Sequence, residues 1–413
     1  MIDFPIVKIG ELIKSGEAEI QTGPFGTQLK ASDYSDHGYP VINVRNVGFG
    51  DIRTESLEFI DDRVAEKLPT HRLMQNDIVF GRKGAVERHG LITGAQEGWY
   101  QGSDCLRLRF NSSRVNPKFI SYFFRTQAHQ DWMMAVCAFG ATMASLNQDI
   151  VKLINVPVPP IDIQNKIVGL LSVYDDLIEN NKRRITLLEN MAEEIYREWF
   201  VRFRFPGWQE AEFEKGYPAS WRAVKFDDFC KLKRGYDLPD SKVMDGPYPV
   251  LASTSVKTFH SEYKVKAPVI TTGRSGSLGT VLFKRENCWP LNTTLYVQNF
   301  KGNSPVFVYF TLKNMPLETF NSGAGVPSLN RNHLAGLRVV VPDEAAQKAF
   351  DDIVEPIFRQ VDTLQAQSEQ LQKTKNQLLP RLISGKLSVE NLDIQFPPSM
   401  QSDESDSADE AAA

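Results

Sequence analysis

Apolar residues recur at seven-residue spacing in two long stretches of the chain, one after Pro159-Pro160 and one after Pro342. Such heptads place apolar side chains along one face of a helix, and two such faces pack together as a coiled coil. We therefore predict two long helices, the first over residues 163–199. The predicted seam residues are Ile167, Leu171, Tyr174, Ile178, Ile185, Leu188, Ile195, Phe350, Val354, Ile357, Val361, Leu364, Leu371 and Leu378.

The second helix has a plausible start at Asp343, whose carboxylate can cap the first turn. Pro356 is expected to kink this helix and Pro380 to weaken its end, because proline removes a backbone donor. Asn181 and Lys375 are polar departures from the seam. A heptad run is also typical of a helix-bundle core, but two runs in register with a sequence repeat favour a paired spacer.

The chain contains an internal repeat with a constant shift of 183 residues. The segment Gly140 to Asn147, ending in Ser-Leu-Asn, recurs as Gly323 to Asn330. The shift continues without a gap, because Gln164 then maps to Gln347 and Val156-x-Val158-Pro159 maps to a similar stretch ending at Pro342. One structural unit is therefore predicted to occur twice.

Short β-like runs bounded by Gly, Asn, Asp or Pro precede each helix. The clearest predicted strands are 39–44, 77–80, 105–110, 268–271 and 294–297, and a helical stretch is predicted from Pro117 to Met134. Each copy is therefore expected to contain a mixed α/β domain.

A chain of 413 residues is longer than a domain with a single hydrophobic core usually is, so two domains are predicted. The formal net charge is −4, and the acidic segment after about Ser399 contributes −5, so the rest of the chain carries about +1. That segment is predicted to be a disordered tail. A nearly neutral body means that any DNA binding must come from local clusters of charge.

The four cysteines lie far apart, which argues against a zinc ribbon or a disulfide framework. The first residues lack the pattern of a signal peptide, and no apolar run is long enough to cross a bilayer. We therefore expect a soluble, cytoplasmic protein that does not bind membranes.

Two similar loops, Gly81-Arg82-Lys83-Gly84 and Gly273-Arg274-Ser275-Gly276, each follow a predicted strand. Glycine permits close backbone approach, and arginine or lysine can bind a phosphate or a guanine edge. Other segments concentrate amide, hydroxyl and basic groups near turns. The candidate DNA-binding residues are Thr27, Gln28, Lys30, Asn43, Arg45, Asn46, Arg82, Lys83, Arg234, Tyr236, Ser253, Thr254, Arg274, Ser275, Asn292 and Thr293.

Familiar catalytic motifs are missing from the sequence: it has no nucleotide-binding P-loop, no amino-methyltransferase box and no histidine pair at helical metal spacing. One degenerate pattern, Asp240 with Glu262 and Lys264, matches the arrangement of metal-dependent nucleases. A DNA endonuclease using these three residues is therefore an alternative hypothesis. A coiled-coil scaffold that binds only proteins is another.

The chain resembles the specificity subunits of type I restriction–modification systems over roughly residues 1–390. The order of four segments within the tandem repeat carries this resemblance. These segments are Ser145-Leu146-Asn147 through Pro159, Trp199-Phe200-Val201-Arg202-Phe203, Pro218-Ala219-Ser220-Trp221, and Leu378-Leu379-Pro380-Arg381-Leu382-Ile383-Ser384-Gly385.

The resemblance implies a mixed α/β fold in which two target-recognition domains are joined by two long antiparallel helices forming a coiled coil, with an internal pseudo-two-fold repeat. Each domain would read one half of a bipartite, asymmetric DNA site, and the helices would set the spacer. The expected domains are residues 1–160 and 206–342, the spacer helices residues 161–205 and 343–390, and the tail residues 391–413.

The resemblance also implies partners: double-stranded DNA, two methyltransferase subunits docked near the helices, and restriction subunits that translocate and cut DNA. S-adenosylmethionine, ATP and Mg²⁺ are then expected in the partner subunits. This chain would be a non-catalytic subunit that holds no cofactor or metal.

Overall fold

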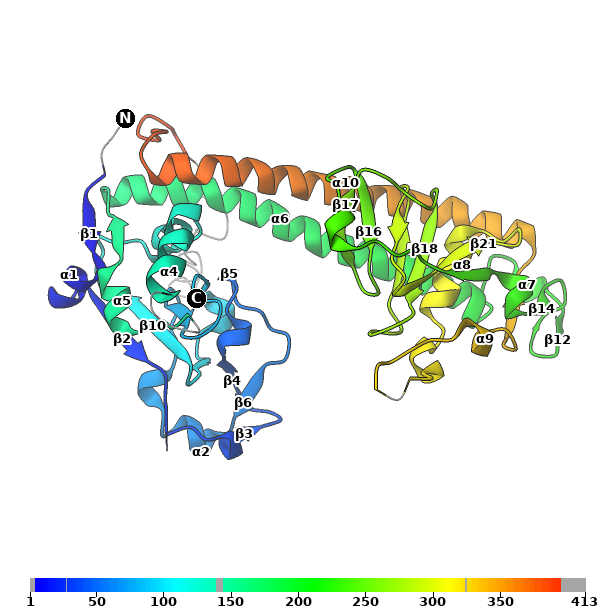
Figure 1. Ribbon diagram of the computed structural model, residues 1–413, viewed down its shortest axis with the longest axis horizontal. Helices are drawn as coiled ribbons and strands as arrows, with labels where there is room; N and C mark the ends of the chain where they lie inside the picture. Colours follow the sequence, from blue (N-terminus) through cyan, green and yellow to red (C-terminus); the bar gives the residue numbers. More distant parts are fainter. Residues whose placement is uncertain (1–3, 27, 139–143, 324, 395–413) are drawn as a thin grey trace, which may run out of the picture. The chain divides into compact units, whose positions relative to one another are not determined.

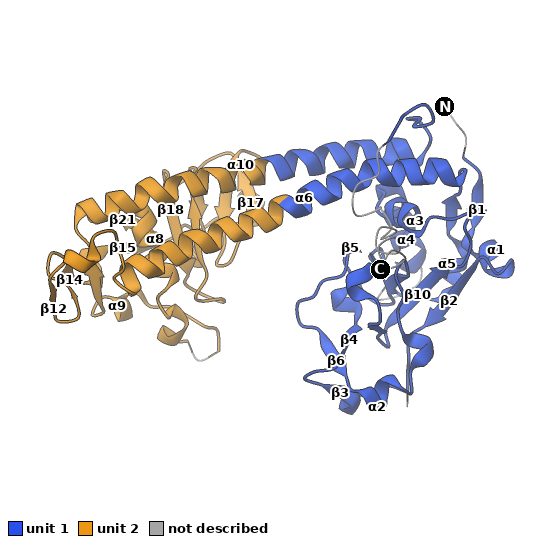
Figure 2. Ribbon diagram, turned by 180° about the vertical axis from the view of Figure 1, so that it is seen from behind, with its two compact units in different colours: residues 1–180, 367–413 blue, residues 181–366 orange. Residues whose placement is uncertain are grey.

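The computed structural model describes residues 4–26, 28–138, 144–323 and 325–394 (Figure 1). It divides into unit 1, residues 1–180 with 367–413, and unit 2, residues 181–366 (Figure 2). Both long helices therefore contribute to both units. The predicted disordered tail after about Ser399, and residues 140–143 of the repeated motif, lie outside the described residues.

Unit 1 contains two main sheets and a separate strand pair. The larger sheet has the order β2 (Ala18–Thr22), β10 (Cys105–Phe110), β7 (Ile78–Gly81), β8 (His89–Leu91), β5 (Phe49–Gly50). The second sheet has the order β3 (Tyr34–Ser35), β6 (Glu58–Ile60), β4 (Tyr39–Ile42), β9 (Tyr100–Gln101). Strand β1 (Ile6–Lys8) pairs antiparallel with β11 (Asn155–Pro157).

The helices of unit 1 are α1 (Ile9–Lys14), α2 (Asp62–Ala65), α3 (Pro117–Phe124), α4 (Gln127–Ala138), α5 (Gln148–Leu153) and the start of α6 (Ile161–Tyr196). The predicted single helix over 117–134 is therefore wrong in detail, because the chain breaks at Arg125 and Thr126, where Thr126 Oγ1 donates to the Phe123 carbonyl at 2.7 Å. Such side-chain bonds compete with helix continuation.

Unit 2 repeats this plan. Its larger sheet has the order β15 (Lys231–Arg234), β21 (Thr294–Asn299), β18 (Val269–Gly273), β19 (Val281–Lys284). Its second sheet has the order β17 (Val256–His260), β16 (Tyr248–Leu251), β20 (Trp289–Pro290). Two further pairs join β14 (Arg222–Lys225) to β22 (Arg338–Val341) and β12 (Phe213–Glu214) to β13 (Tyr217–Pro218).

The helices of unit 2 are α7 (Phe226–Phe229), α8 (Pro305–Lys313), α9 (Arg331–Leu334) and most of α10 (Glu344–Ile383). Its core is rich in aromatic rings, and the ring centroid of Phe200 lies 4.9 Å from that of Phe307 and 4.9 Å from that of Phe350. Edge-to-face rings of this kind pack densely, and each buries a large apolar area.

Strand pairing confirms the predicted repeat. In unit 1, β4 pairs antiparallel with β6 and parallel with β9, and in unit 2, β16 pairs antiparallel with β17 and parallel with β20. In the larger sheets, the order β2-β10-β7-β8 of unit 1 corresponds to the order β15-β21-β18-β19 of unit 2. Because the same order recurs, positions in the two units can be equated through their strand partners.

A buried glutamine joins each long helix to the helix that lies beneath it. Gln164 Oε1 accepts from the backbone N–H of Asn116, the N-cap of α3, at 2.8 Å, and its Nε2 donates to the Pro159 carbonyl at 2.7 Å. Gln347 makes the same contacts with Ser304, the N-cap of α8, at 2.7 Å and with Pro342 at 3.1 Å. These bonds satisfy both ends of a buried amide and fix where each long helix starts.

The start of α10 is capped as predicted, because Asp343 Oδ1 accepts from the Ala346 backbone N–H at 2.8 Å. Helix α10 runs through both Pro356 and Pro380. The kink expected at Pro356 and the weaker end expected at Pro380 stay predictions. None of the described helices is long and apolar enough to cross a bilayer.

The two long helices pack against each other within each unit (Figure 2). In unit 1 the beginning of α6 contacts the end of α10, with Ile167 and Leu171 in one core with Leu379 and Leu382. In unit 2 the end of α6 contacts the beginning of α10, where the ring centroids of Tyr196 and Phe350 lie 6.2 Å apart. The pairing is therefore antiparallel in each unit. Every predicted seam residue is buried or half-buried. That these residues pack as the knobs and holes of a coiled coil stays a prediction.

One ion pair lies in the helix interface of unit 1. Lys375 Nζ lies within 2.5 Å of Asp175 Oδ1, and Tyr122 donates to the other carboxylate oxygen at 2.6 Å. Burial raises the pKa of Asp175, but Arg125, Lys375 and these hydrogen bonds together hold it below its ordinary value. The 183-residue shift places Phe358 and Ala192, both buried, at the corresponding positions of unit 2.

We predict that Lys375→Ala destabilises unit 1 by roughly 1–2 kcal/mol, because Asp175 would remain in the interface and keep, among the described residues, Arg125 and Tyr122 as partners. Hydrogen exchange of the end of α10 should accelerate accordingly. Lys373→Ala, which removes an exposed lysine two positions away on the same helix, is the matched control. Equal effects of the two substitutions would contradict the role of the pair.

Candidate nucleic-acid interface

The two Gly-containing loops are held in the same way in both units. The Arg82 carbonyl accepts from the Leu146 N–H at 2.8 Å, and the Arg274 carbonyl accepts from the Leu329 N–H at 2.8 Å. The neighbouring residues Lys83 and Ser275 form isolated bridges with Ser145 and Ser328. The repeated Ser-Leu-Asn motif therefore clamps the loop that carries the candidate arginine.

In unit 2 the predicted segments converge around this loop. Ser253 Oγ lies 2.9 Å from the Ser275 carbonyl and 3.0 Å from the Thr293 carbonyl, to which it can donate. The Thr293 carbonyl also accepts from the backbone N–H groups of Arg274 and Ser275 at 2.8 and 3.1 Å. Asn292 donates to Asp237 through its side chain. Four segments distant in sequence therefore meet at one surface.

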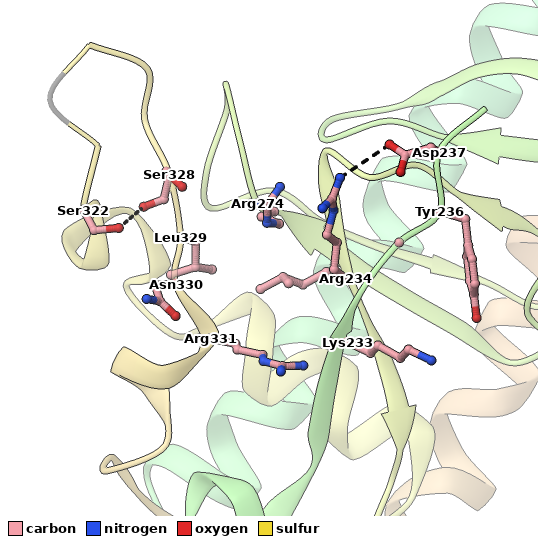
Figure 3. Close-up of a pocket in the computed structure, with 12 residues that line it drawn as sticks. Lys233, Arg234, Tyr236, Asp237, Arg274, Ser322, Ser328, Leu329, Asn330 and Arg331 are labelled. Carbon is pink, nitrogen blue, oxygen red and sulfur yellow. Dashed lines mark hydrogen bonds and ion pairs between the residues drawn. The ribbon is translucent and has the colours of Figure 1, made fainter. Parts of the chain in front are cut away.

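This surface contains a cavity of about 690 Å³. Figure 3 shows Arg234, Arg274 and Arg331 around it, carried by β15, the Gly273–Gly276 loop and α9. Its remaining lining residues are Lys233, Gly235, Tyr236, Asp237, Leu295, Ser322, Ser328, Leu329 and Asn330. A concave site with several hydrogen-bond donors suits a polar, anionic ligand.

Tyr236 stacks on a second ring, that of Tyr296, and lies close to Lys233. The Tyr236 and Tyr296 hydroxyls lie 3.0 Å apart, and their rings stack with centroids 5.9 Å apart. Burial and this hydrogen bond raise the pKa of Tyr296. Lys233 Nζ lies 5.9 Å from the centre of the Tyr236 ring, so the charge of Lys233 stabilises this aromatic pair.

In unit 1 the corresponding loop carries Arg82, half-buried, and Lys83, exposed. Lys83 Nζ lies 3.1 Å from Asp104 Oδ1, and the Arg82 N–H donates to the Asp104 carbonyl at 2.9 Å. Asn43 donates to Glu58 Oε2 at 2.6 Å. The loop and the segment around Asn43 therefore carry polar groups that are already partly paired.

Two predicted residues of unit 1, Asn46 and Arg45, bond to other residues of the same unit. Asn46 is fully buried, and its amide donates to the Arg53 and Glu55 carbonyls at 3.1 and 3.2 Å. Its burial argues against the predicted DNA contact. Arg45 lies 2.9 Å from Glu58, an exposed ion pair that leaves part of its guanidinium accessible.

Three other candidates lie on exposed chain segments. Gln28, Lys30 and Thr254 are exposed, and the Lys30 backbone N–H donates to Asp33 Oδ2 at 2.8 Å. Among the described residues, Gln28 and Lys30 form no hydrogen bond or ion pair with the Arg82 loop. Thr27 lies outside the described residues.

Sequence reasoning missed Arg331 and Asp237. Arg331 follows the repeated Ser-Leu-Asn directly, at the position that Gln148 occupies in the first copy. That difference at an otherwise matching position was a usable signal. Asp237 lies three residues after Arg234, and its carboxylate is 3.4 Å from that guanidinium.

The geometry gives no support to the nuclease alternative. Asp240 Oδ1 lies 2.6 Å from Lys257 Nζ, whereas Lys264 lies 3.7 Å from Glu262 and 4.5 Å from the centre of the Trp289 ring. Within the described ranges, no three acidic, histidine or cysteine side chains lie close enough together to hold a metal ion.

The cysteines are also poor nucleophiles in this structure. All four are buried free thiols, and burial raises the pKa of Cys105, Cys230 and Cys288 to about 12. A thiol must ionise before it attacks, so these groups stay inert at neutral pH.

We predict that Gly273→Ala distorts the loop of unit 2 and destabilises the unit by on the order of 2 kcal/mol, because overpacking is costly. A Cβ at this position would lie 1.8 Å from the Ser277 carbonyl oxygen, so the backbone must move. Gly325→Ala is the control, since a Cβ there meets nothing within 4 Å. The two melting temperatures test this, and equal values would refute the close approach.

Comparison with known proteins relates the whole arrangement to one family. The type I restriction modification DNA specificity domain matches residues 1–190 and 218–373. The putative type I restriction enzyme MjaX specificity subunit of Methanocaldococcus jannaschii is 23% identical over 384 residues, covering 85% of this chain and 88% of that protein. The MjaIX specificity subunit of the same organism is 26% identical over 309 residues, covering 67% of this chain and 71% of that protein.

A solved structure shares the fold. The type I restriction–modification S subunit from M. genitalium has a TM-score of 0.56 at 17% identity, covering 92% of this chain and 96% of that chain. The family match spans most of the sequence in two copies, in step with the repeated strand order of the two units. The chain therefore belongs to the family of type I restriction–modification DNA specificity subunits.

Proposed function

We propose that each unit reads one half of a bipartite, asymmetric DNA sequence on behalf of a type I restriction–modification complex. The observation that carries this proposal is the duplicated scaffold, which presents an equivalent loop, Gly81–Gly84 or Gly273–Gly276, in each unit. Phosphate contacts from such loops position DNA, and side chains that reach base edges specify the sequence.

The two half-sites should differ because equivalent positions carry different chemistry. Lys83 of unit 1 corresponds to Ser275 of unit 2, and Gln148 corresponds to Arg331. An ammonium, a hydroxyl, an amide and a guanidinium group differ in which base edges they pair with. An asymmetric target follows from two unlike sets of side chains on one scaffold.

We propose that the paired helices fix the spacing between the half-sites and dock two methyltransferase subunits. Exposed apolar side chains on α6 support a docking role, because they lie outside the seam. Leu177, Leu187 and Met191 are 45%, 68% and 47% exposed. Apolar side chains left in water on a helix surface are typical of a protein–protein interface.

Catalysis is assigned to the partners. In this proposal the chain has no catalytic site, and S-adenosylmethionine, ATP and Mg²⁺ are used by the methyltransferase and restriction subunits. The complex would act on double-stranded DNA in the cytoplasm. Its activity would then depend on this chain only for the choice of site.

Exchanging residues 217–340 for the corresponding segment of a relative should change one half of the methylated sequence and leave the other half intact. Unit 2 has its own core, so its reading loops can be replaced as a block. Genome-wide mapping of methylated sites measures the result. A change in both halves would contradict independent reading, and absence of any sequence-specific methylation by the wild-type complex would refute DNA specificity itself.

Inserting one heptad into each long helix, between 180 and 190 in α6 and between 360 and 370 in α10, should lengthen the unread spacer. Seven residues keep the apolar face in phase, so the seam can continue. The same mapping should recover both half-sites unchanged. An unaltered spacer length would contradict the proposal that the helices set it.

A further inference from the structure

Three guanidinium groups of unit 2 line one cavity although they come from separate elements. Arg234 is the last residue of β15, Arg274 lies in the Gly273–Gly276 loop, and Arg331 begins α9. Figure 3 shows the three side chains on different sides of the same space. The fold therefore holds three positive charges close to one another.

Little negative charge balances this cluster. Asp237 is the only carboxylate among the lining residues, and it lies 3.4 Å from Arg234. In the part of the chain that the structure describes, Arg274 and Arg331 form no salt bridge; they donate to the Asn292 and Leu232 carbonyls at 3.1 and 3.3 Å. Each guanidinium has five N–H donors, so most donors remain available for a ligand.

The equivalent positions of unit 1 are mainly neutral. Strand pairing equates Thr22, opposite Leu106, with Arg234, opposite Leu295. Gln148 takes the place of Arg331, and its amide donates to Thr22 Oγ1 at 2.9 Å. Arg82 is then the one cation of the three positions in this unit. In unit 1 the side chains of Gln148 and Thr22 hydrogen-bond to each other. In unit 2 the corresponding arginines carry like charges and line a cavity.

We propose that the Arg234–Arg274–Arg331 cavity binds a backbone phosphate of DNA, so that unit 2 supplies an electrostatic contact that the equivalent positions of unit 1 lack. A phosphate has several anionic oxygens and can accept from guanidinium groups that approach from different directions. Reading a guanine edge instead takes one bidentate arginine. The proposal rests on the function proposed above and adds which unit supplies the electrostatic part of binding.

The test gives unit 2 the side chains of unit 1, in the full chain assembled with its methyltransferase subunits. The variant is Arg234→Thr with Arg331→Gln, and the probe is a duplex containing the target sequence found by methylation mapping. The logarithm of the binding constant falls linearly with the logarithm of the salt concentration, and each lost phosphate contact makes this slope less steep by about 0.9. Between 50 and 200 mM salt, the variant should therefore lose roughly three- to fourfold less affinity than the wild type for each such contact. Its methylated sequence should not change.

Three further variants separate charge from structure. Arg331→Lys keeps the charge but not the planar guanidinium, and should retain the wild-type slope. Arg338→Gln removes an exposed arginine of β22 that does not line the cavity, and should also leave the slope unchanged. Thr22→Arg with Gln148→Arg in unit 1 should steepen the slope. Melting temperatures show which variants keep their fold.

Several results would overturn the proposal. An unchanged slope in Arg234→Thr/Arg331→Gln shows that the cavity holds no phosphate, and an unchanged slope with an altered second half-site shows that the arginines read bases. A less steep slope in Arg331→Lys would mean that the salt dependence requires the hydrogen bond from Arg331 to the Leu232 carbonyl and not the positive charge alone. All three results presuppose a wild-type complex that binds its target, so they are distinct from failure of the proposed function, in which the wild type binds no specific sequence.

Discussion

The fold depends on apolar contacts between chain segments that are very far apart in sequence. The core of unit 1 is completed by Leu379, Leu382 and Ile383, which belong to the last turns of α10 and pack with Ile167 and Leu171 near the start of α6. Hydrophobic burial is the main favourable contribution to folding, so unit 1 cannot form its full core from its first 180 residues alone. Closing this long loop costs chain entropy, which the helix interface must offset.

The same interface gives the reading loops a rigid base. The glutamines at 164 and 347 bond the helices beneath them, and the Ser-Leu-Asn segments clamp the loops that carry Arg82 and Arg274. Backbone groups make most of these bonds, so side chains on the loops can change without loss of the clamp. Conserved scaffolds with variable loops are the general way in which binding specificity diversifies.

Much of this was predictable from the sequence, and the failures have physical causes. The repeat followed from a constant shift, and the cap at Asp343 from its side chain. The break at Arg125 was missed, because the periodicity of apolar residues does not show the local bond from Thr126 that competes with helix continuation. The cavity with Arg331 was missed because a tertiary contact, in which Arg331 of α9 donates to the Leu232 carbonyl of β15, joins segments that are far apart in sequence. Asn46 looked like a surface amide until the fold enclosed it.

The ion pair between Asp175 and Lys375 has a consequence for how such genes can recombine. Its two members are encoded 200 positions apart, and removing either one leaves the other in the interface without that charge partner. A single crossover between residues 175 and 375 takes them from different parents and can leave one charge in the interface without its partner. Exchanges confined to the segment between the helices, which keep both members from one parent, are the ones that preserve folding while target choice diverges.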